Sequence, residues 1–365
     1  MREKRYVRKV FAVLMSLAAC LCFLVASPVK AEERPSRTEL APILERFEES
    51  VERTRKEFKI PGMAVAVIQN DELVYVEGFG VREINGAETV NPETVFQIGS
   101  TSKAFTAALV ASVVDEGVLG WKDPVRSHLP DFAMADSWVT ENFQVRDLMA
   151  QHSGMKPYAG DVLVLLGYGR EDVLRSMAHI EPVYSFRSEF SYVNNLWLAA
   201  AALVESKTGK SWEDNLKERI LDPLGMSSSS CSMKEYLGLA NAATLHVVSD
   251  GEVRPLGRRW PFFNWPYVYA PAGGINSNVL DMAKWVRFQL GDGTFGGKDI
   301  LTTENLVYPH HPQTPISEKD SYCMGWVKTD YEGHELIWHN GETTGCKSLV
   351  MLVPELDLGI VILSN

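Results

Sequence analysis

The chain has 365 residues, of which 45% are hydrophobic and 23% are charged, and its formal net charge is −11. This length suits one large domain or two closely packed ones. The acidic balance, with no long basic run to offset it, argues against nucleic acid and anionic lipid as partners, because both carry negatively charged phosphate.

Residues 1–31 have the pattern of an export signal. A basic stretch precedes an apolar, uncharged run over 10–26, and a site suited to a signal peptidase ends at Ala31. We therefore expect a mature domain over 32–365 that is exported to the periplasm or the cell exterior. Two alternatives stay open, an uncleaved anchor and a lipoprotein with its lipid on Cys20. Membrane contact would then come only through this segment.

Cleavage would leave three cysteines, Cys231, Cys323 and Cys346. An odd number in an oxidising compartment leaves at least one thiol unpaired, and the sequence does not say which of them pair, if any. These cysteines have no C-x-x-C spacing, so the pattern indicates neither a zinc knuckle nor a redox pair.

The first part of the mature chain predicts a helix followed by strands. Apolar residues recur at helical spacing over 38–58. Two strands, 63–69 and 73–79, follow around a turn. A short strand at 95–98 then leads into a helix over 101–116, which is apolar nearly all round and is therefore expected to be a buried central helix.

Residues from about 118 to 250 predict an α-rich insertion, with helices over 194–208 and 212–220. Beyond it, Pro271-Ala272-Gly273-Gly274 predicts a loop and 278–290 a helix. The last strands are expected at 322–329, 334–339, 346–353 and 357–363. We predict an α/β (α+β) fold, with an antiparallel sheet built from both chain ends, flanked by helices and carrying the α-rich insertion beside it.

Ser100-Thr101-Ser102-Lys103 is the first motif that indicates chemistry. Ser100 lies at the start of the central helix, and Lys103 returns to the same face one turn later. A serine hydroxyl needs a base within hydrogen-bonding distance, and a lysine amine can serve when burial lowers its pKa. Alone the pattern is weak, because Ser27 and Lys30 repeat it inside the signal segment.

Tyr192-Val193-Asn194 is the second motif. Side chains two residues apart in an extended segment share one face, so a phenol and an amide can point into one cleft. A phenol beside a lysine ammonium is expected to ionise more easily and to pass a proton. The alternative is a tyrosine that only packs at the start of the following helix.

His339-Asn340-Gly341 is the third motif, at the end of a predicted strand. A glycine allows close backbone approach, and the next N–H, that of Glu342, is then placed to help bind an oxyanion. A second His-x-Gly sequence, His152-Ser153-Gly154, follows a predicted helix, and we interpret it as structural.

In this order the three motifs resemble those of the serine β-lactamase and penicillin-binding enzyme superfamily, and most closely its class C-like branch. The resemblance runs from about Ser50 to Asn365 and implies a β-lactamase/transpeptidase-like fold. The framework phrases that extend it are Val145-Arg146-Asp147-Leu148, Asp222-Pro223-Leu224-Gly225-Met226 and Pro271-Ala272-Gly273-Gly274.

The resemblance implies a role for each motif residue. Ser100 would become acylated, Lys103 would act as base and Tyr192 would pass the proton to the leaving group. The backbone N–H groups of Ser100 and Glu342 would form the oxyanion hole. The residues implied in binding a small-molecule or peptide substrate are Asn194, His339, Asn340 and Gly341. The resemblance implies no metal and no organic cofactor.

Two departures from the branch stand out. The third motif begins with His339 where many members have lysine, and a histidine is mostly neutral near pH 7. We expect it to make the protein a poor β-lactamase, and to become charged as the pH falls toward about 6. The chain also stops at Asn365, just after a strand, where the branch usually adds a closing helix, so we expect a truncated C-terminus.

Three functions follow from these patterns. The first is an exported serine hydrolase that cleaves a peptide or amide bond of the D-alanyl type, or an ester. The second is a true β-lactamase. The third is a slowly acylating binding or sensor protein, although a pure binder has no need of an activated base. The oligomeric state is not predicted.

Two further patterns are weaker. Aromatic residues crowd 260–269, where they either line the cleft or pack in the ordinary way. His334, Glu335 and His339 mimic a zinc-protease motif with one residue too many, and positions five apart on a strand face opposite sides, which argues against a metal site.

Overall fold

The structure is a computed structural model that describes residues 37–257 and 259–365. The expected signal over 1–31, its cleavage site and the alternative lipid on Cys20 lie outside these residues. In the described ranges, no helix has the length and apolar character needed to cross a membrane.

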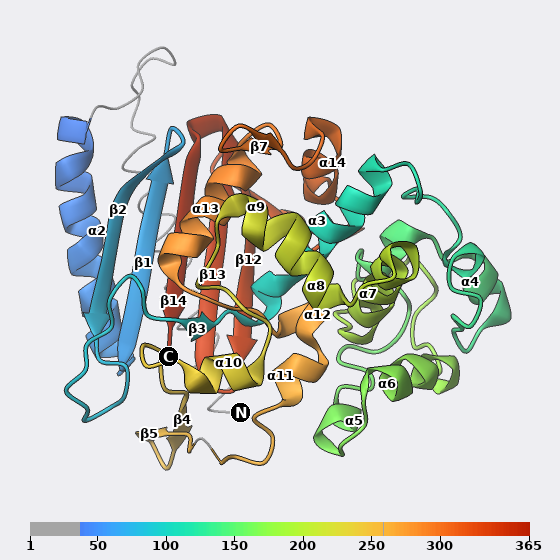
Figure 1. Cartoon of the computed structure of the whole chain (residues 1–365), viewed down its shortest axis with the longest axis horizontal. Coiled ribbons are helices and arrows are strands. Elements are labelled where there is room, and N and C mark those ends of the chain that lie inside the picture. The colour runs from blue at the N-terminus through green and yellow to red at the C-terminus, as the bar shows by residue number, and fades with distance from the viewer. Residues whose placement is uncertain (1–36, 258) are drawn as a thin grey trace.

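An eight-stranded sheet forms the centre of the molecule (Figure 1). Its order is β2-β1-β14-β13-β12-β11-β10-β9, and each neighbouring pair is antiparallel. The strands are β1 (Gly62–Gln69), β2 (Glu72–Gly80), β9 (Thr314–Pro315), β10 (Asp320–Tyr322), β11 (Val327–Tyr331), β12 (His334–Thr343), β13 (Cys346–Val353) and β14 (Leu358–Ser364). Because β1 pairs with β14, the two ends of the chain share one sheet, as predicted.

Both faces of this sheet are covered by helices. Ala64, Ala66 and Ile68 of β1 belong to the larger core, together with side chains of α3 (Ser102–Asp115) and α13 (Val279–Leu290). The alternate residues of β1 face the other way, where α2 (Arg37–Glu57) packs its apolar side. The two sets alternate because side chains along a strand point to opposite faces.

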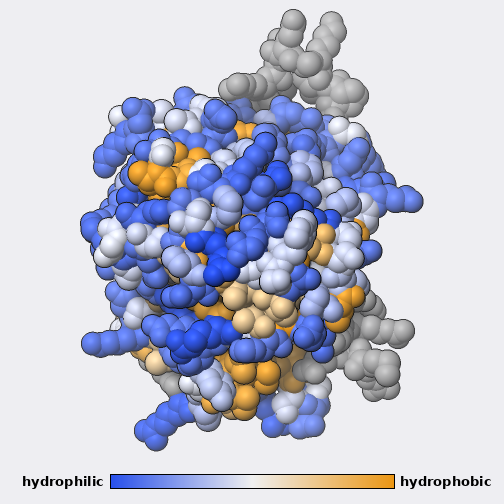
Figure 2. All heavy atoms as spheres, turned by 90° about the vertical axis from the view of Figure 1, so that its right-hand side faces the viewer, coloured by the Kyte–Doolittle hydropathy of each residue, from blue (hydrophilic) through white to orange (hydrophobic). Residues whose placement is uncertain are grey.

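A group of helices lies beside the sheet, to its right in Figure 1. It comprises α4 (Ser137–Asn142), α5 (Val162–Leu165), α6 (Arg170–Ser176) and α7 (Asn195–Thr208). The chain then returns toward the sheet through α8 (Trp212–Leu216), the π-helix η5 (Lys217–Leu221) and α9 (Asp222–Leu224), and in this view α9 and α10 (Met233–Gly238) overlap the sheet. A hairpin, β4 (His246–Ser249) with β5 (Glu252–Pro255), follows. From this side the surface is mostly hydrophilic with scattered apolar patches (Figure 2), and the exposed apolar side chains in and beside α5 are Val162, Leu165 and Leu166.

The structure corrects two predicted elements. The strand expected at 322–329 is divided into β10 and β11, because Gly325 adopts a left-handed φ of 78° and turns the chain against α3. A Cβ on Gly325 would lie 2.7 Å from the backbone N of Ala104, so only glycine allows this approach. The loop expected at Pro271-Ala272-Gly273-Gly274 is largely a short helix, α12 (Ala270–Gly273).

Short elements complete the chain. They are β3 (Phe96–Gln97), η1 (Gly99–Thr101), η2 (Val125–Ser127), η3 (Val145–Leu148), η4 (Met177–His179), α11 (Trp265–Val268), β6 (Asn276–Ser277), β7 (Thr294–Phe295), β8 (Lys298–Asp299), α14 (Thr303–Val307), η6 (Tyr308–His310) and η7 (Pro354–Leu356). The three cysteines of the described ranges, Cys231, Cys323 and Cys346, are all free thiols.

Candidate active site

Two glycines bring the start of the central helix against strand β12. Gly99, in η1, has a left-handed φ of 54°, and a Cβ there would lie 2.6 Å from the backbone N of Glu342. A Cβ on Gly341 would lie 1.8 Å from the carbonyl oxygen of Ile98. Side chains at either position would force the two segments apart. The backbone of Glu342 therefore lies next to the turn that carries Ser100.

The end of β12 borders this turn because its neighbour stops early. Strand β11 pairs with β12 only from His334 to Trp338, whereas β12 continues to Thr343. The last part of β12 thus has β13 on one side and the start of α3 near the other. His339, Asn340 and Glu342 from this part line a cavity.

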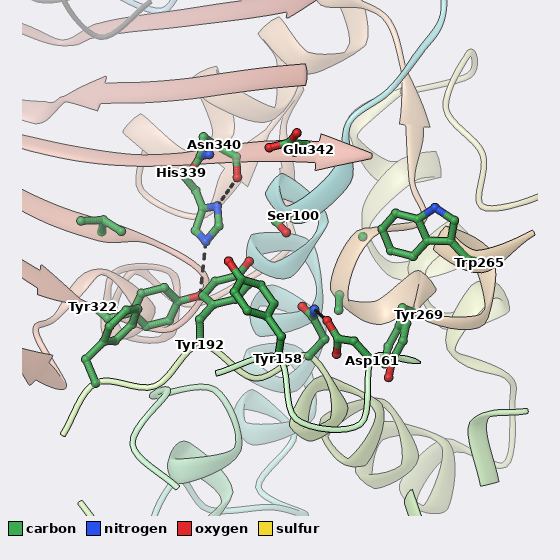
Figure 3. Close-up of a pocket in the computed structure, with 15 residues that line it drawn as sticks. Ser100, Tyr158, Asp161, Tyr192, Trp265, Tyr269, Tyr322, His339, Asn340 and Glu342 are labelled. Atoms are coloured by element: carbon green, nitrogen blue, oxygen red, sulfur yellow. Dashed lines mark hydrogen bonds between the residues drawn. The ribbon is translucent and has the colours of Figure 1, made fainter. Parts of the chain in front are cut away.

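This cavity has a volume of about 420 Å³ and opens above Ser100 (Figure 3). It brings together residues from the central helix, the α-rich region, α11 and α12, and the sheet. The side chains that line it are Ser100, Tyr158, Asp161, Phe190, Tyr192, Asn194, Trp265, Tyr269, Ala272, Tyr322, Val327, His339, Asn340 and Glu342, with Gly273. Gly341, expected to bind substrate, is not among the lining residues and instead packs against Ile98.

Lys103 lies beneath the cavity with no exposed surface. Its Nζ is 3.2 Å from Ser100 Oγ, 2.8 Å from Asn194 Oδ1 and 2.8 Å from the carbonyl oxygen of Ala272. Burial lowers the pKa of Lys103 from 10.5 to about 7, because removal from water disfavours the ammonium, and the carboxylate of Asp161 opposes part of this shift. The predicted lowering of the lysine pKa by burial is thus confirmed.

With three acceptors around it, Nζ can donate to all three as an ammonium, and the same contacts also accommodate a neutral amine. An uncharged amine has two hydrogens and one lone pair. Asn194 Oδ1 and the carbonyl of Ala272 can only accept, so they take the two hydrogens. The lone pair is then left for the hydroxyl hydrogen of Ser100, which can donate to Lys103 Nζ. This is the geometry of a nucleophile with its base.

The pKa of Tyr192 departs from the expectation drawn from the sequence. Its ring lies with its centroid 4.8 Å from Lys103 Nζ. Burial nevertheless raises the pKa of Tyr192 above its usual value of 10, and a hydrogen bond with Ser100 only partly opposes this. The prediction that the lysine would ease ionisation of this phenol is therefore wrong. The phenol therefore keeps its proton at neutral pH, and its raised pKa makes it a weaker acid than an exposed tyrosine.

His339 has both ring nitrogens engaged and is only 3% exposed. Its Nδ1 is 2.6 Å from the carbonyl oxygen of Asn340, so Nδ1 carries the hydrogen and donates it. Nε2 then accepts from Tyr322 Oη at 3.3 Å (Figure 3). Burial lowers the pKa of His339 to about 3, with Lys103 adding to the shift. The imidazole is neutral at pH 7 as predicted, but the expected protonation near pH 6 is wrong.

Asp161 is a cavity residue that no sequence motif indicated. It precedes α5, and its Oδ2 accepts a hydrogen bond from Asn194 Nδ2 at 2.8 Å. Burial raises the pKa of Asp161 to about 6, against the opposing effects of Asn194 and Lys103. The amide of Asn194 thus bridges a carboxylate and an amine.

The aromatic residues of 260–269 divide between the two interpretations that the sequence left open. Trp265 and Tyr269 line the cavity. Phe263 is buried, and its ring packs near that of Tyr236. Tyr267 is also buried and donates to Asn276 Oδ1 at 2.8 Å.

The other histidine motifs are structural. His152 bonds with Asp147 Oδ1 at 2.8 Å and with Thr314 Oγ1 at 2.9 Å, as expected of a packing residue. At the start of β12, His334 pairs with Glu355 and Glu335 pairs with Lys328, each through part-exposed side chains. Within 37–257 and 259–365, no cluster of three or more His, Cys, Asp or Glu side chains is arranged to hold a metal ion.

The relatives found among curated proteins include the following two. The chain is 29% identical over 341 residues to the unguisins hydrolase ungD' of Aspergillus campestris, covering 89% of this chain and 62% of that protein. It is 24% identical over 321 residues to protein flp of Staphylococcus aureus, covering 86% of this chain and 61% of that protein. The chain therefore spans less than two thirds of the length of these relatives.

Among solved structures, an octameric penicillin-binding protein homologue from Pyrococcus abyssi superposes with a TM-score of 0.77, covering 88% of this chain and 73% of that one. At 24% identity this likeness shows the fold, which is the predicted β-lactamase/transpeptidase-like one. The sequence model of the Beta-lactamase family matches residues 47–365, which include helix α3 and all three motifs. The chain therefore belongs to the beta-lactamase family.

Proposed function

We propose that this protein is an exported serine hydrolase that forms an acyl-enzyme on Ser100 and cleaves an amide bond, of the D-alanyl type, or an ester bond. The observation that carries the proposal is the set of three hydrogen bonds at Lys103 Nζ. The relative named a hydrolase supports an enzyme over a binding protein. Export is inferred from the sequence of residues 1–31 alone.

The proposed reaction begins with attack of Ser100 Oγ on the substrate carbonyl, while Lys103 Nζ takes the hydroxyl proton. The carbonyl oxygen becomes an oxyanion that the backbone N–H groups of Ser100 and Glu342 stabilise. Tyr192 donates its proton to the departing amine or alcohol and regains one from Lys103. Water then attacks the ester on Ser100 by the same steps in reverse order, which releases the acid and restores the hydroxyl.

The charges around the cavity favour uncharged or cationic substrates over anionic ones. Among the residues that line it there is no lysine or arginine, whereas Asp161 and Glu342 both contribute carboxylates, of which that of Glu342 is paired with Lys347 at 2.7 Å. His339 is neutral. An anionic β-lactam would therefore find no cation among the lining residues. A D-alanyl peptide with a free terminal carboxylate shares this disadvantage, so within the proposal these charges favour an ester, or an amide without a neighbouring carboxylate. This is why we place a true β-lactamase second.

We expect the wild-type enzyme to hydrolyse nitrophenyl esters faster than nitrocefin at pH 7.5. A cation hydrogen-bonded to a carboxylate contributes roughly 1.5–3 kcal/mol, and each 1.4 kcal/mol is about tenfold in rate. The His339→Lys variant should therefore raise the nitrocefin-to-ester ratio of kcat/KM by about 10- to 100-fold. His339→Gln, which stays neutral, is the matched control and should leave that ratio nearly unchanged. A wild-type enzyme that prefers nitrocefin would contradict the assignment.

The activity should also depend on pH in a defined direction. The neutral amine is the active form of Lys103, so activity is present above its pKa and lost as the pH falls through about 7. His339, whose pKa is about 3, stays neutral throughout this range. The kcat/KM of the wild-type enzyme for a nitrophenyl ester, measured across this range, should therefore fall as the pH drops through about 7; we call this fall the acid limb of the profile. A profile flat down to about pH 5 would exclude a neutral Lys103 as the base.

A further inference from the structure

Asp161 is a carboxylate in the cavity that the proposed acyl transfer does not use. Its Oδ2 accepts from Asn194 Nδ2 at 2.8 Å, while its Oδ1 is buried and has no hydrogen-bond partner. Figure 3 shows the Asp161 carboxylate beside Tyr269, among the residues that line the cavity. An ionised carboxylate only accepts hydrogen bonds, so it dictates which end of a neighbouring amide can face it.

The orientation of the Asn194 amide follows from this contact. Its Nδ2 is a donor and faces Asp161, which turns its Oδ1, an acceptor, toward Lys103 Nζ at 2.8 Å. The reversed amide would set two acceptors against each other at Asp161, and its Nδ2 would face Lys103 as a donor and engage the lone pair that the neutral amine offers to Ser100. Asp161 therefore determines that an acceptor faces the lysine.

We propose that Asp161 is a positioning residue: by fixing the Asn194 amide, it holds one hydrogen of the Lys103 amine away from Ser100 and keeps the lone pair directed at the serine hydroxyl. The role rests on the proposed function, because it matters only if Lys103 acts as the base for Ser100.

The charge of Asp161 has a second effect. Across Asn194 it raises the pKa of Lys103, in opposition to burial, so removing the charge should keep the amine neutral at lower pH. The phenols of Tyr158, Tyr192 and Tyr269 also face this carboxylate, and burial raises the pKa of each. They keep their protons across the neutral range, which leaves Lys103 as the partner whose charge responds.

Two variants separate the hydrogen bond from the charge. Asp161→Asn keeps an oxygen that can accept from Asn194 Nδ2 but removes the charge, whereas Asp161→Ala removes both. The readout is the rate at which a fluorophosphonate labels Ser100, measured against pH in the full chain. This readout requires no knowledge of the natural substrate.

We expect Asp161→Asn to keep its plateau rate within about threefold of wild type and to move its acid limb to lower pH by roughly half a unit or more, less than the ~1–3 units of a direct ion pair. Asp161→Ala should lose about tenfold or more of the plateau, since the amide is no longer held. Asp172→Asn, at a half-exposed position in the first turn of α6 and outside the cavity lining, is the matched control and should follow the wild-type profile.

If the wild type is labelled normally and both Asp161 variants keep the plateau and the acid limb of its labelling-rate profile, the role of Asp161 is overturned. The proposed function would then still stand. Equal losses in both variants with an unmoved acid limb would also overturn the role of Asp161, since that pattern reports only damage to the cavity wall. Absence of labelling in the wild type would overturn the proposed function itself. The melting temperature of each variant identifies any that fail to fold, and Asp161→Asn, which preserves shape and hydrogen bond, keeps the test decisive.

Discussion

Lys103→Ala is expected to reduce kcat/KM for a nitrophenyl ester by at least ~10²-fold and up to ~10⁴-fold, the range of general acid–base catalysis. The variant removes the amine whose Nζ lies 3.2 Å from Ser100 Oγ. At neutral pH an unassisted serine hydroxyl is a weak nucleophile, so no other group can replace this one without moving. Alanine is a good helix former, and position 103 lies inside α3, so the helix should persist.

Two companion variants define what the lysine does. Lys103→Arg keeps a positive charge but cannot lose its proton, so it should be as inactive as the alanine variant if Lys103 is a base. Lys122→Ala, at an exposed position, is the matched control and should retain wild-type kcat/KM. The measurement is steady-state kinetics on a nitrophenyl ester with the wild type, Lys103→Ala, Lys103→Arg and Lys122→Ala. High activity in Lys103→Arg would mean that the site needs only a cation there.

The sheet could be predicted because its strands carry nearly continuous apolar runs close to both ends of the chain. Strands β13 and β14 are buried along almost their whole length. Such apolar runs predict strands even when the strands that pair with them are unknown. That both chain ends contribute to one sheet followed from the layout of strands around an α-rich middle, whereas the direct pairing of β1 with β14 is seen only in the structure.

The short helix α12 was not predictable in the same way. Its sequence, Ala-Pro-Ala-Gly, is typical of a loop, because proline and glycine normally interrupt helices. The structure places Pro271 in the first turn, where its missing N–H is not needed. Tertiary contacts then hold the segment, since Pro271 O accepts from Thr106 Oγ1 at 2.7 Å and Ala272 O accepts from Lys103 Nζ.

In the candidate site, too, the residues related by local geometry were predicted, and the residue brought in by a distant loop was not. Ser100 and Lys103 are one helical turn apart, and Tyr192 and Asn194 are two residues apart, so local geometry alone places each pair on one face. Asp161 bonds to Asn194 across 33 residues of chain, through a loop whose course no local pattern fixes. The wrong direction for the pKa of Tyr192 has a similar origin, because the sequence shows a neighbouring cation but not the depth of burial that outweighs it.

Ser100→Ala is expected to abolish both turnover and covalent labelling. The variant removes the one oxygen that the proposed mechanism acylates, while the cavity and the buried lysine stay in place. The loss should be complete within detection, because no other serine lines the cavity in the described ranges. Ser153→Ala is the matched control: Ser153 is buried in the other His-x-Gly segment and should be dispensable.

The central claim, that Ser100 is the nucleophile, is tested most directly by locating the covalent label. The full chain is treated with a fluorophosphonate, digested, and the modified peptide sequenced by mass spectrometry. We predict a single modified site, at Ser100, present in wild type and Ser153→Ala and absent in Ser100→Ala. A label recovered on any other serine, or one that persists in Ser100→Ala, would contradict the account.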